Sequence, residues 1–291
     1  MHPIKPGALL QPEASSTRPY QIGKHTILLK REHLLRDYQS KHRLYDRFLP
    51  ILCKHLDDLD HWIIDVGANV GDTAVAVGQV CRNPILCVEG YDEYFNLLKC
   101  NINSSFVGRE RPVTCIKAIV GSGRFSGLLK GDGTSAGLVQ GPEQRAVSLD
   151  MLAHEAGVPA GAVALIKVDT DGYDGDVILS ATEILAKSKP VIFWENYFST
   201  MEQMQDLEAF YQRLPDSNYR HFWVFDNFGN LMLQECSLSS LIDLNHYVAS
   251  QEFHNCTRTI YYTDILAAGV ERLESVRQAI SAFRSTAITQ G

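Results

Sequence analysis

From residue 62 onward, short apolar segments alternate along the chain with longer segments that have helical periodicity. The short segments are rich in branched residues and lack polar alternation, which is typical of strands buried on both faces. Between them, apolar residues recur every three or four positions, as Phe95, Leu98 and Ile102 do. Such alternation predicts an α/β fold with a parallel sheet covered on both sides. The predicted strands are residues 62–66, 85–89, 113–118, 163–169 and 191–195.

Segments before and after this region have weaker patterns. Residues 1–19 are expected to form a loose leader, followed by a short strand that starts at His25 and by a basic stretch over 24–47. That stretch is either a solvated helix face or a lid over a ligand. Downstream we expect strands at 221–225 and 259–263 and a closing helix that contains Val270 and Phe283. The predicted units are 1–59, a leader and lid or substrate segment; 60–268, the main domain; and 269–291, a C-terminal helix and tail.

Two local patterns add to this outline. Leu44, Phe48, Leu52 and Leu56 recur every four residues and predict one apolar helix face. The segment 121–141 is rich in glycine and predicts a long loop beside a substrate pocket, since long loops in compact domains are usually functional or disordered.

Charge and cysteine content exclude several classes of protein. The chain has 27 Lys and Arg against 34 Asp and Glu, a net charge of −7, so it lacks the basic footprint of a nucleic-acid binder. No stretch approaches the roughly 18 consecutive apolar residues of a membrane span, and the first residues lack the apolar core of a signal peptide. The seven cysteines are dispersed without a CxxC pair, which predicts reduced thiols and a cytoplasmic protein.

The turn after the first predicted strand carries the strongest functional signal. It contains Asp65, Gly67, Asn69, Gly71 and Asp72, and the second strand ends in Glu89. In an open parallel sheet, ligands bind beyond the carboxyl ends of the strands, where glycines let the backbone approach a ligand closely. The simpler interpretation is a plain strand-to-helix turn, but the acids and the amide at these strand ends favour a binding site.

Two nucleoside cofactors fit such a turn. A dinucleotide site has the pattern G-x-G-x-x-G and places a diphosphate over the helix start, whereas this turn is G-x-N-x-G and is followed by Asp72. Carboxylates beside a diphosphate repel it, but they attract a ligand that carries an ammonium and a sulfonium. S-adenosylmethionine (SAM) is such a ligand, and Glu89 can accept both ribose hydroxyls. The charge pattern therefore favours SAM over NAD.

Four segments resemble the FkbM family of class I SAM-dependent methyltransferases. They are residues 64–71, 88–101, 147–150 and 165–174, and residues 190–195 also fit the fifth strand of that family. The resemblance implies a Rossmann-like, mostly parallel seven-stranded sheet with helices on both faces, its last strand antiparallel, and an N-terminal extension. It also implies that 60–268 is a SAM-binding methyltransferase domain. Residues 33–46 are similar to leaders of members associated with surface-glycan biosynthesis.

The resemblance also implies roles for individual residues. Asp169 ends the fourth strand and would face both the cofactor methyl group and the substrate, and we expect it to act in catalysis with Glu195. The adenine would be bordered by backbone groups near Lys117 and Ala118. The remaining expected cofactor-binding residues are Asp65, Gly67, Ala68, Asn69, Gly71, Asp72, Thr73, Glu89 and Gly90.

Methyl transfer to an alcohol gains from a base or a metal ion, because an alcohol is a poor nucleophile. Lys167 lies on the same strand face as Asp169 and could pair with it, as a buried structural ion pair more than as a catalyst. Asp169, Glu195 and Asn196 offer oxygen ligands for Mg²⁺, an alternative that we leave open without assigning a metal site. Asp174 is interpreted as a helix cap, and Ser148 as an N-cap.

The sequence thus predicts a SAM-dependent O-methyltransferase that acts on a hydroxyl of a sugar, a glycan precursor or another small acceptor. Neither nucleic acid nor an integral membrane segment is expected, and a homodimer is left open. A catalytically silent SAM-binding partner protein is the main alternative, and an NAD-linked oxidoreductase is a weaker one.

Overall fold

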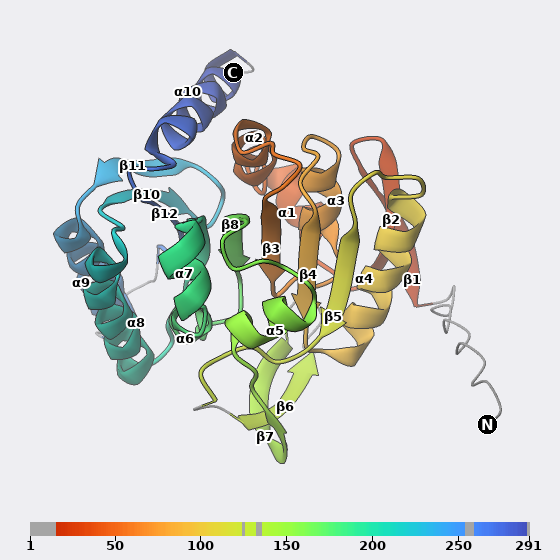
Figure 1. The fold of residues 1–291 in the computed structure, drawn as a ribbon. Helices are drawn as coiled ribbons and strands as arrows, with labels where there is room; N and C mark the ends of the chain where they lie inside the picture. The colour runs from red at the N-terminus through yellow and green to blue at the C-terminus, as the bar shows by residue number, and fades with distance from the viewer. Residues whose placement is uncertain (1–15, 124–125, 132–135, 254–258, 290–291) are drawn as a thin grey trace.

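The computed structural model describes residues 16–123, 126–131, 136–253 and 259–289. A central sheet of eight strands, in the order β11-β10-β12-β9-β8-β3-β4-β5, forms the core of this part of the chain (Figure 1). The strands β5, β4, β3, β8 and β9 pair in parallel, whereas β12 is antiparallel to both of its neighbours and β11 to β10. The α/β class and the Rossmann-like, mainly parallel sheet are therefore confirmed. The strands are β3 (Trp62–Val66), β4 (Ile85–Glu89), β5 (Val113–Lys117), β8 (Val163–Val168), β9 (Val191–Asn196), β10 (His221–Asp226), β11 (Leu231–Cys236) and β12 (Thr263–Ala268).

Helices cover both faces of the sheet, because successive side chains on a strand point to opposite sides. On β3, Ile63 packs in one apolar cluster and Ile64 in the other. The first cluster contains residues of α1 (Leu35–Lys41), α2 (Phe48–His55), α3 (Asp72–Gly78), α4 (Asp92–Ser105) and α10 (Leu273–Thr289). The second contains residues of α5 (Leu149–Glu155), α6 (Asp174–Leu179), α7 (Thr182–Ser188), α8 (Met201–Arg213) and α9 (Leu238–Phe253).

Two antiparallel hairpins accompany the sheet. The first pairs β1 (Thr17–Ile22) with β2 (His25–Lys30), and the second pairs β6 (Ser126–Gly131) with β7 (Ala136–Arg145). The second hairpin extends away from the sheet in Figure 1. The expectation of a long loop over 121–141 was wrong for the described residues, because 126–131 pair with β7; residues 124–125 and 132–135 lie outside the described ranges. The expected position beside a pocket is supported, since Leu129 lines the cavity described below. Of the loose leader expected over 1–19, residues 17–19 instead belong to β1, and residues 1–15 lie outside the described residues.

The other departures from the sequence prediction lie at the antiparallel edge of the sheet. The implied seven strands are eight here, because the chain turns back after β10 and adds β11. The strand expected over 259–263 instead begins at Thr263, and the closing helix begins at Leu273.

Two helix starts can also be compared with the sequence prediction. The α2 helix begins at Phe48, so Leu44 precedes it. The N-cap at Ser148 is confirmed, because its hydroxyl accepts the Met151 N–H at 3.3 Å.

Asn101 joins the first hairpin to the turn after β3. Its side-chain oxygen accepts the Leu28 N–H at 2.7 Å, and its amide nitrogen donates to the Leu28 and Val70 carbonyls at 3.0 and 2.8 Å. The side chain is 1% exposed, so these bonds satisfy a buried amide. The β2 strand is therefore held against the same turn that contains Gly67 and Gly71.

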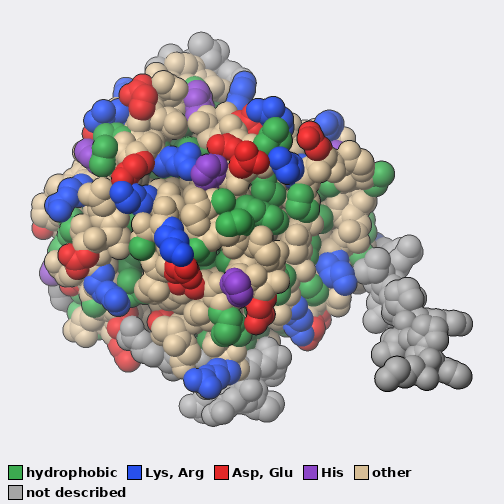
Figure 2. Space-filling model, viewed as in Figure 1, with side chains coloured by type: hydrophobic (Ala, Val, Ile, Leu, Met, Phe, Trp, Pro, Cys, Tyr) green, Lys and Arg blue, Asp and Glu red, His purple; other side chains and the backbone are tan. Residues whose placement is uncertain are grey.

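The described helices include none that is both long enough and apolar enough to cross a bilayer. On the face that Figure 2 shows, acidic and basic side chains are interspersed.

Candidate functional site

A cavity of about 700 Å³ lies beyond the carboxyl ends of β3, β4, β8 and β9. Residues of the segment 33–49 and of the turn between β10 and β11 line it as well. The N-terminal segment is fixed to that turn by a ring stack between His42 and Phe228, with centroids 3.9 Å apart. A Cβ atom on Gly229 would lie 2.3 Å from the Leu44 carbonyl oxygen, so glycine permits this close contact. The cavity is thus bounded by residues from both ends of the chain.

The turn after β3 depends on Gly67. Its φ of +74° lies in the left-handed region, and a Cβ atom there would lie 1.8 Å from the Asp169 carbonyl oxygen. Because the strands β3 and β8 are neighbours, this contact brings the two strand ends together. Only glycine fits this position, and its small volume leaves the adjoining backbone open to the cavity.

Glu89 ends β4 and fixes the conformation of this turn. Its Oε2 atom accepts the Asn69 N–H at 2.9 Å, and its Oε1 atom accepts the Tyr91 N–H at 2.7 Å. Burial raises the pKa of this carboxyl group, although the two backbone hydrogen bonds oppose the rise. Glu89 is 7% exposed and lines the cavity, so the free lone pairs of its oxygens can accept hydroxyl groups of a ligand.

Lys167 bridges two carboxylates beneath the turn. Its Nζ atom lies 3.2 Å from both Asp65 Oδ1 and Asp169 Oδ2, and it donates to the Gly67 carbonyl at 3.3 Å. Burial lowers the pKa of Lys167, but the charges of Asp169 and Asp65 overcome this and hold the pKa well above its ordinary value. The expected pairing of Lys167 with Asp169 is therefore confirmed. Asp65 is 2% exposed and supports the site from behind rather than lining the cavity.

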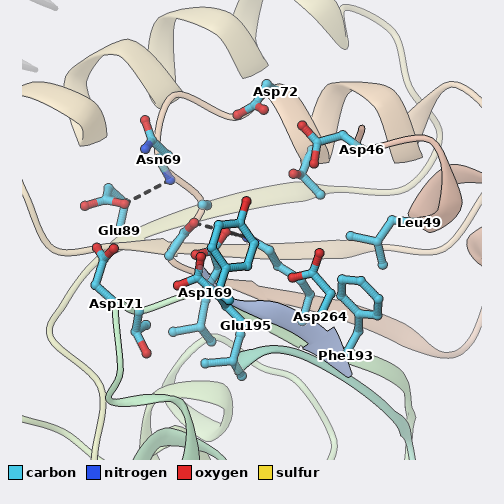
Figure 3. A pocket seen from close by; sticks show the side chains of 18 of the residues that line it. Asp46, Leu49, Asn69, Asp72, Glu89, Asp169, Asp171, Phe193, Glu195 and Asp264 are labelled. Atoms are coloured by element: carbon cyan, nitrogen blue, oxygen red, sulfur yellow. Dashed lines mark hydrogen bonds and ion pairs between the residues drawn. The ribbon is translucent and has the colours of Figure 1, made fainter. Parts of the chain in front are cut away.

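Carboxyl groups dominate the cavity wall. Figure 3 shows Glu89 and Asp171 on one side of the close-up, Asp169 and Glu195 in the middle, and Asp46 and Asp264 on the other side. We call the last region, which also contains Leu49 and Phe193, the Asp264 end. The described cavity-lining residues include seven carboxyl groups and a single lysine, Lys167. Those seven are Asp46, Asp72, Glu89, Asp169, Asp171, Glu195 and Asp264.

Glu195 and Asp264 are directly opposite each other in the pairing of β9 with β12. Burial, followed by the charges of nearby carboxylates such as Asp169, raises the pKa of both groups well above their ordinary values. Burial and the charge of Asp72 raise the pKa of Asp46 to about 7. The Asp264 end therefore holds acids that repel one another when no cation is present.

Most of the expected site residues meet at this cavity. Asp65, Gly71 and Lys117 do not line it: the Lys117 ammonium pairs with Asp92, and Gly71 packs against Leu98. Sequence reasoning missed Asp46 and Asp264, although Asp264 is the second residue of the observed strand β12. The expected residues that do line the cavity are Gly67, Ala68, Asn69, Asp72, Thr73, Glu89, Gly90, Ala118, Asp169 and Glu195.

Asn196, one of the three residues considered as Mg²⁺ ligands, is not available to bind a metal ion. Asn196 is 3% exposed; its oxygen accepts the Tyr211 hydroxyl, and its nitrogen donates to Asn245 and Thr263 at 2.9 and 3.1 Å. Its amide is therefore engaged in an internal network. Within the described ranges, no group of three or more His, Cys, Asp or Glu residues is arranged to hold a metal ion.

Asp174, at the start of α6, makes stability depend on pH. It is fully buried; its Oδ2 atom accepts from Thr170 and Gly172, and its Oδ1 atom has no partner among the described residues. Burial and the charge of Asp169 raise its pKa to about 7. Between an unfolded pKa of about 3.9 and this value, the folded chain holds a proton that the unfolded chain has lost, so stability falls as pH rises.

Replacing Asp174 with Asn should therefore remove part of this pH dependence. We expect urea unfolding of Asp174→Asn to show a smaller loss of unfolding free energy between pH 5 and pH 8 than wild type. Asp216→Asn, at an exposed position, should follow the wild-type curve. Equal pH slopes for wild type and Asp174→Asn would contradict the assignment.

Comparison with known proteins finds no matching family and only distant structural similarity. No family model matches the chain, and no curated protein sequence matches it. Solved structures that are similar include an O-methyltransferase from Bacillus cereus in complex with SAH, with a TM-score of 0.45, 13% identity, and coverage of 81% of this chain and 88% of that one. A putative O-methyltransferase from Klebsiella pneumoniae has a TM-score of 0.44, 12% identity, and coverage of 80% and 87%. TYW2 of M. jannaschii in complex with AdoMet has a TM-score of 0.43, 9% identity, and coverage of 87% and 85%. At such low similarity, the neighbours assign no activity to this chain.

Proposed function

We propose that this protein is a SAM-dependent methyltransferase that methylates a hydroxyl group of a sugar, a glycan precursor or another small acceptor. The observation that carries the proposal is the charge of the cavity. Seven carboxyl groups and one lysine line a pocket at the carboxyl ends of parallel strands. This environment attracts a nucleoside that bears an ammonium and a sulfonium, and it repels a diphosphate.

The site residues have separate tasks in this proposal. Glu89 accepts the ribose hydroxyls, and backbone groups near Ala118 border the adenine. The backbone of Gly67, Ala68 and Asn69 holds the amino-acid part, with Asp65 and Lys167 keeping this turn in place. Bound SAM supplies an electrophilic methyl group, and the protein aligns the acceptor oxygen with it.

Asp169 is the proposed general base. Its side chain is half exposed, lies at the cavity, and is oriented by the ion pair with Lys167. A carboxylate within reach of the acceptor hydroxyl can take its proton as the new bond forms. Glu195 follows the β9 residue that pairs with Val168, next to Asp169, and is proposed to position the acceptor.

The resemblance to the FkbM family belongs to this proposal, as does the sugar acceptor that the family suggests. A cytoplasmic location is also part of it, on the ground of the dispersed cysteines without a CxxC pair in the sequence. A homodimer remains a prediction.

Calorimetry with SAM, SAH and NAD tests the cofactor. We expect SAM and SAH to bind and NAD to show no heat of binding, and tighter binding of NAD would overturn the proposal. Transfer of a labelled methyl group from SAM to a glycan extract then tests the activity. In that assay Asp169→Asn should lower transfer by about hundredfold or more while SAM binding persists. Binding of SAM without any transfer by wild type would favour a catalytically silent partner protein.

A further inference from the structure

We propose that the Asp264 end of the cavity binds a protonated amine, so that the acceptor is a hydroxyl compound that also carries an ammonium group. This inference rests on the proposed function and names the chemical class of its acceptor. Amino sugars and amino alcohols belong to this class.

The first argument is the charge that remains after the cofactor is counted. SAM has an ammonium, a sulfonium and a carboxylate, hence one net positive charge. Lys167 is already shared between Asp65 and Asp169. These two positive charges face the seven carboxyl groups of the cavity wall and Asp65, so most of the acids have no cation of their own. At the Asp264 end, Asp46, Asp264 and the Glu195 that is paired with Asp264 across the strands have no lysine or arginine beside them among the described residues that line the cavity. A second positive charge at that end relieves their repulsion.

The second argument is independent of charge and concerns unpartnered polar groups. Glu195 Oε2 has no contact with solvent and no hydrogen-bond partner in the described part of the chain, although Glu195 lies in the cavity wall. Asn227, which also lines the cavity, is 8% exposed, and its side-chain amide makes no hydrogen bond to any described residue. Buried polar groups are usually paired, so both groups indicate a polar ligand at this place.

The third argument is the set of aromatic rings around these acids. Tyr45, Tyr262, Phe193 and Phe225 line the same cavity. The face of an aromatic ring attracts a cation, and rings combined with carboxylates select an ammonium over a neutral group. A divalent metal ion needs several oxygen ligands, and a wall that consists partly of aromatic rings supplies fewer of them, so this wall favours an ammonium.

The amine is a recognition group and does not receive the methyl group. Carboxylates around an ammonium keep it protonated, and a protonated amine has no lone pair with which to attack. Asp169 and Glu195 directly follow Val168 and Trp194, which pair in the neighbouring strands β8 and β9, so an ammonium at Glu195 places a nearby hydroxyl of the same molecule beside Asp169. Methylation therefore remains on oxygen.

Calorimetry on the full chain loaded with SAH tests this inference. The probes are three matched pairs: glucosamine and glucose, galactosamine and galactose, ethanolamine and ethylene glycol. We expect at least one amine to bind about tenfold or more tightly than its neutral partner, since hydrogen bonds to charged groups are the stronger kind. Glu195→Gln and Asp264→Asn should each reduce that preference by about tenfold. The control Glu202→Gln, on the exposed start of α8, should leave it unchanged.

Each outcome of these titrations either supports or overturns the inference of an ammonium-bearing acceptor. Equal or tighter binding of every neutral partner overturns the inference, as does a preference that survives both variants. Binding of Mg²⁺ with no amine preference overturns it as well. Titration with SAH comes first: if SAH fails to bind, the proposed function itself fails, whereas SAH binding without amine preference removes only the acceptor class. Thermal unfolding of both variants establishes that they are folded.

Discussion

Replacement of Glu89 by glutamine should weaken SAM binding by about hundredfold, because hydrogen bonds to a charged group contribute roughly 1.5–3 kcal/mol each. Glutamine is nearly isosteric but has one acceptor oxygen instead of two. Both carboxylate oxygens already accept backbone N–H groups, from Asn69 and from Tyr91. The amide nitrogen of glutamine would face one of these donors, so the turn loses its support together with the proposed acceptor of the ribose hydroxyls.

Calorimetry with SAM and SAH measures this effect directly, without any acceptor. Glu155→Gln is the matched control, because Glu155 is exposed at the end of α5 and far along the chain from the turn. Unchanged affinity in Glu89→Gln, with the fold intact by circular dichroism, would mean that Glu89 does not contact the ligand.

Replacement of Lys167 by methionine should lower the free energy of unfolding by about 3–5 kcal/mol. The Lys167 side chain is 8% exposed and is the counter-ion of Asp65, whose side chain is 3% exposed. Removing the cation leaves Asp65 buried and unpaired, and Asp169 then repels it. Burial already raises the pKa of Asp65, so the variant should lose more stability at pH 8 than at pH 5.

Urea unfolding measures this loss against two comparison variants. Lys187→Met removes an exposed partner of Glu183 and should leave the free energy of unfolding nearly unchanged, because solvent screens the pair. The double variant Asp65→Asn with Lys167→Met should recover part of the stability, because the buried charge is gone. A cost no greater than that of Lys187→Met would show that the Lys167 pair is not the support of the turn.

The parts of the site that are local in sequence could be predicted, and those that depend on distant packing could not. Gly67 and Glu89 follow directly from strand ends and turn chemistry, since each lies next to a strongly apolar segment. Asp264 was missed because its strand, which pairs antiparallel with both β9 and β10, begins later than the apolar pattern suggested. Asp46 reaches the cavity only because residues 33–49 pack against the turn that contains Gly229.

The direction in which the Asp65 side chain points could not be predicted from the sequence either. The position of Asp65 at the end of β3 was right, but its side chain pairs with a lysine 102 residues later instead of facing the cavity. The edge strand β11 was not predicted either; it has no fully buried residue, because only one of its sides pairs with a neighbouring strand.

The bonds of Asn101 to Leu28 and Val70 have a thermodynamic consequence. A ligand that stabilises the glycine turn also stabilises the bonds that dock the first hairpin, and by linkage a firmly docked hairpin favours the ligand by the same amount. Hydrogen exchange at the Leu28 amide would then report on events at a cofactor that it never touches. The strands β1 and β2 thereby contribute to the affinity of the site for its ligand.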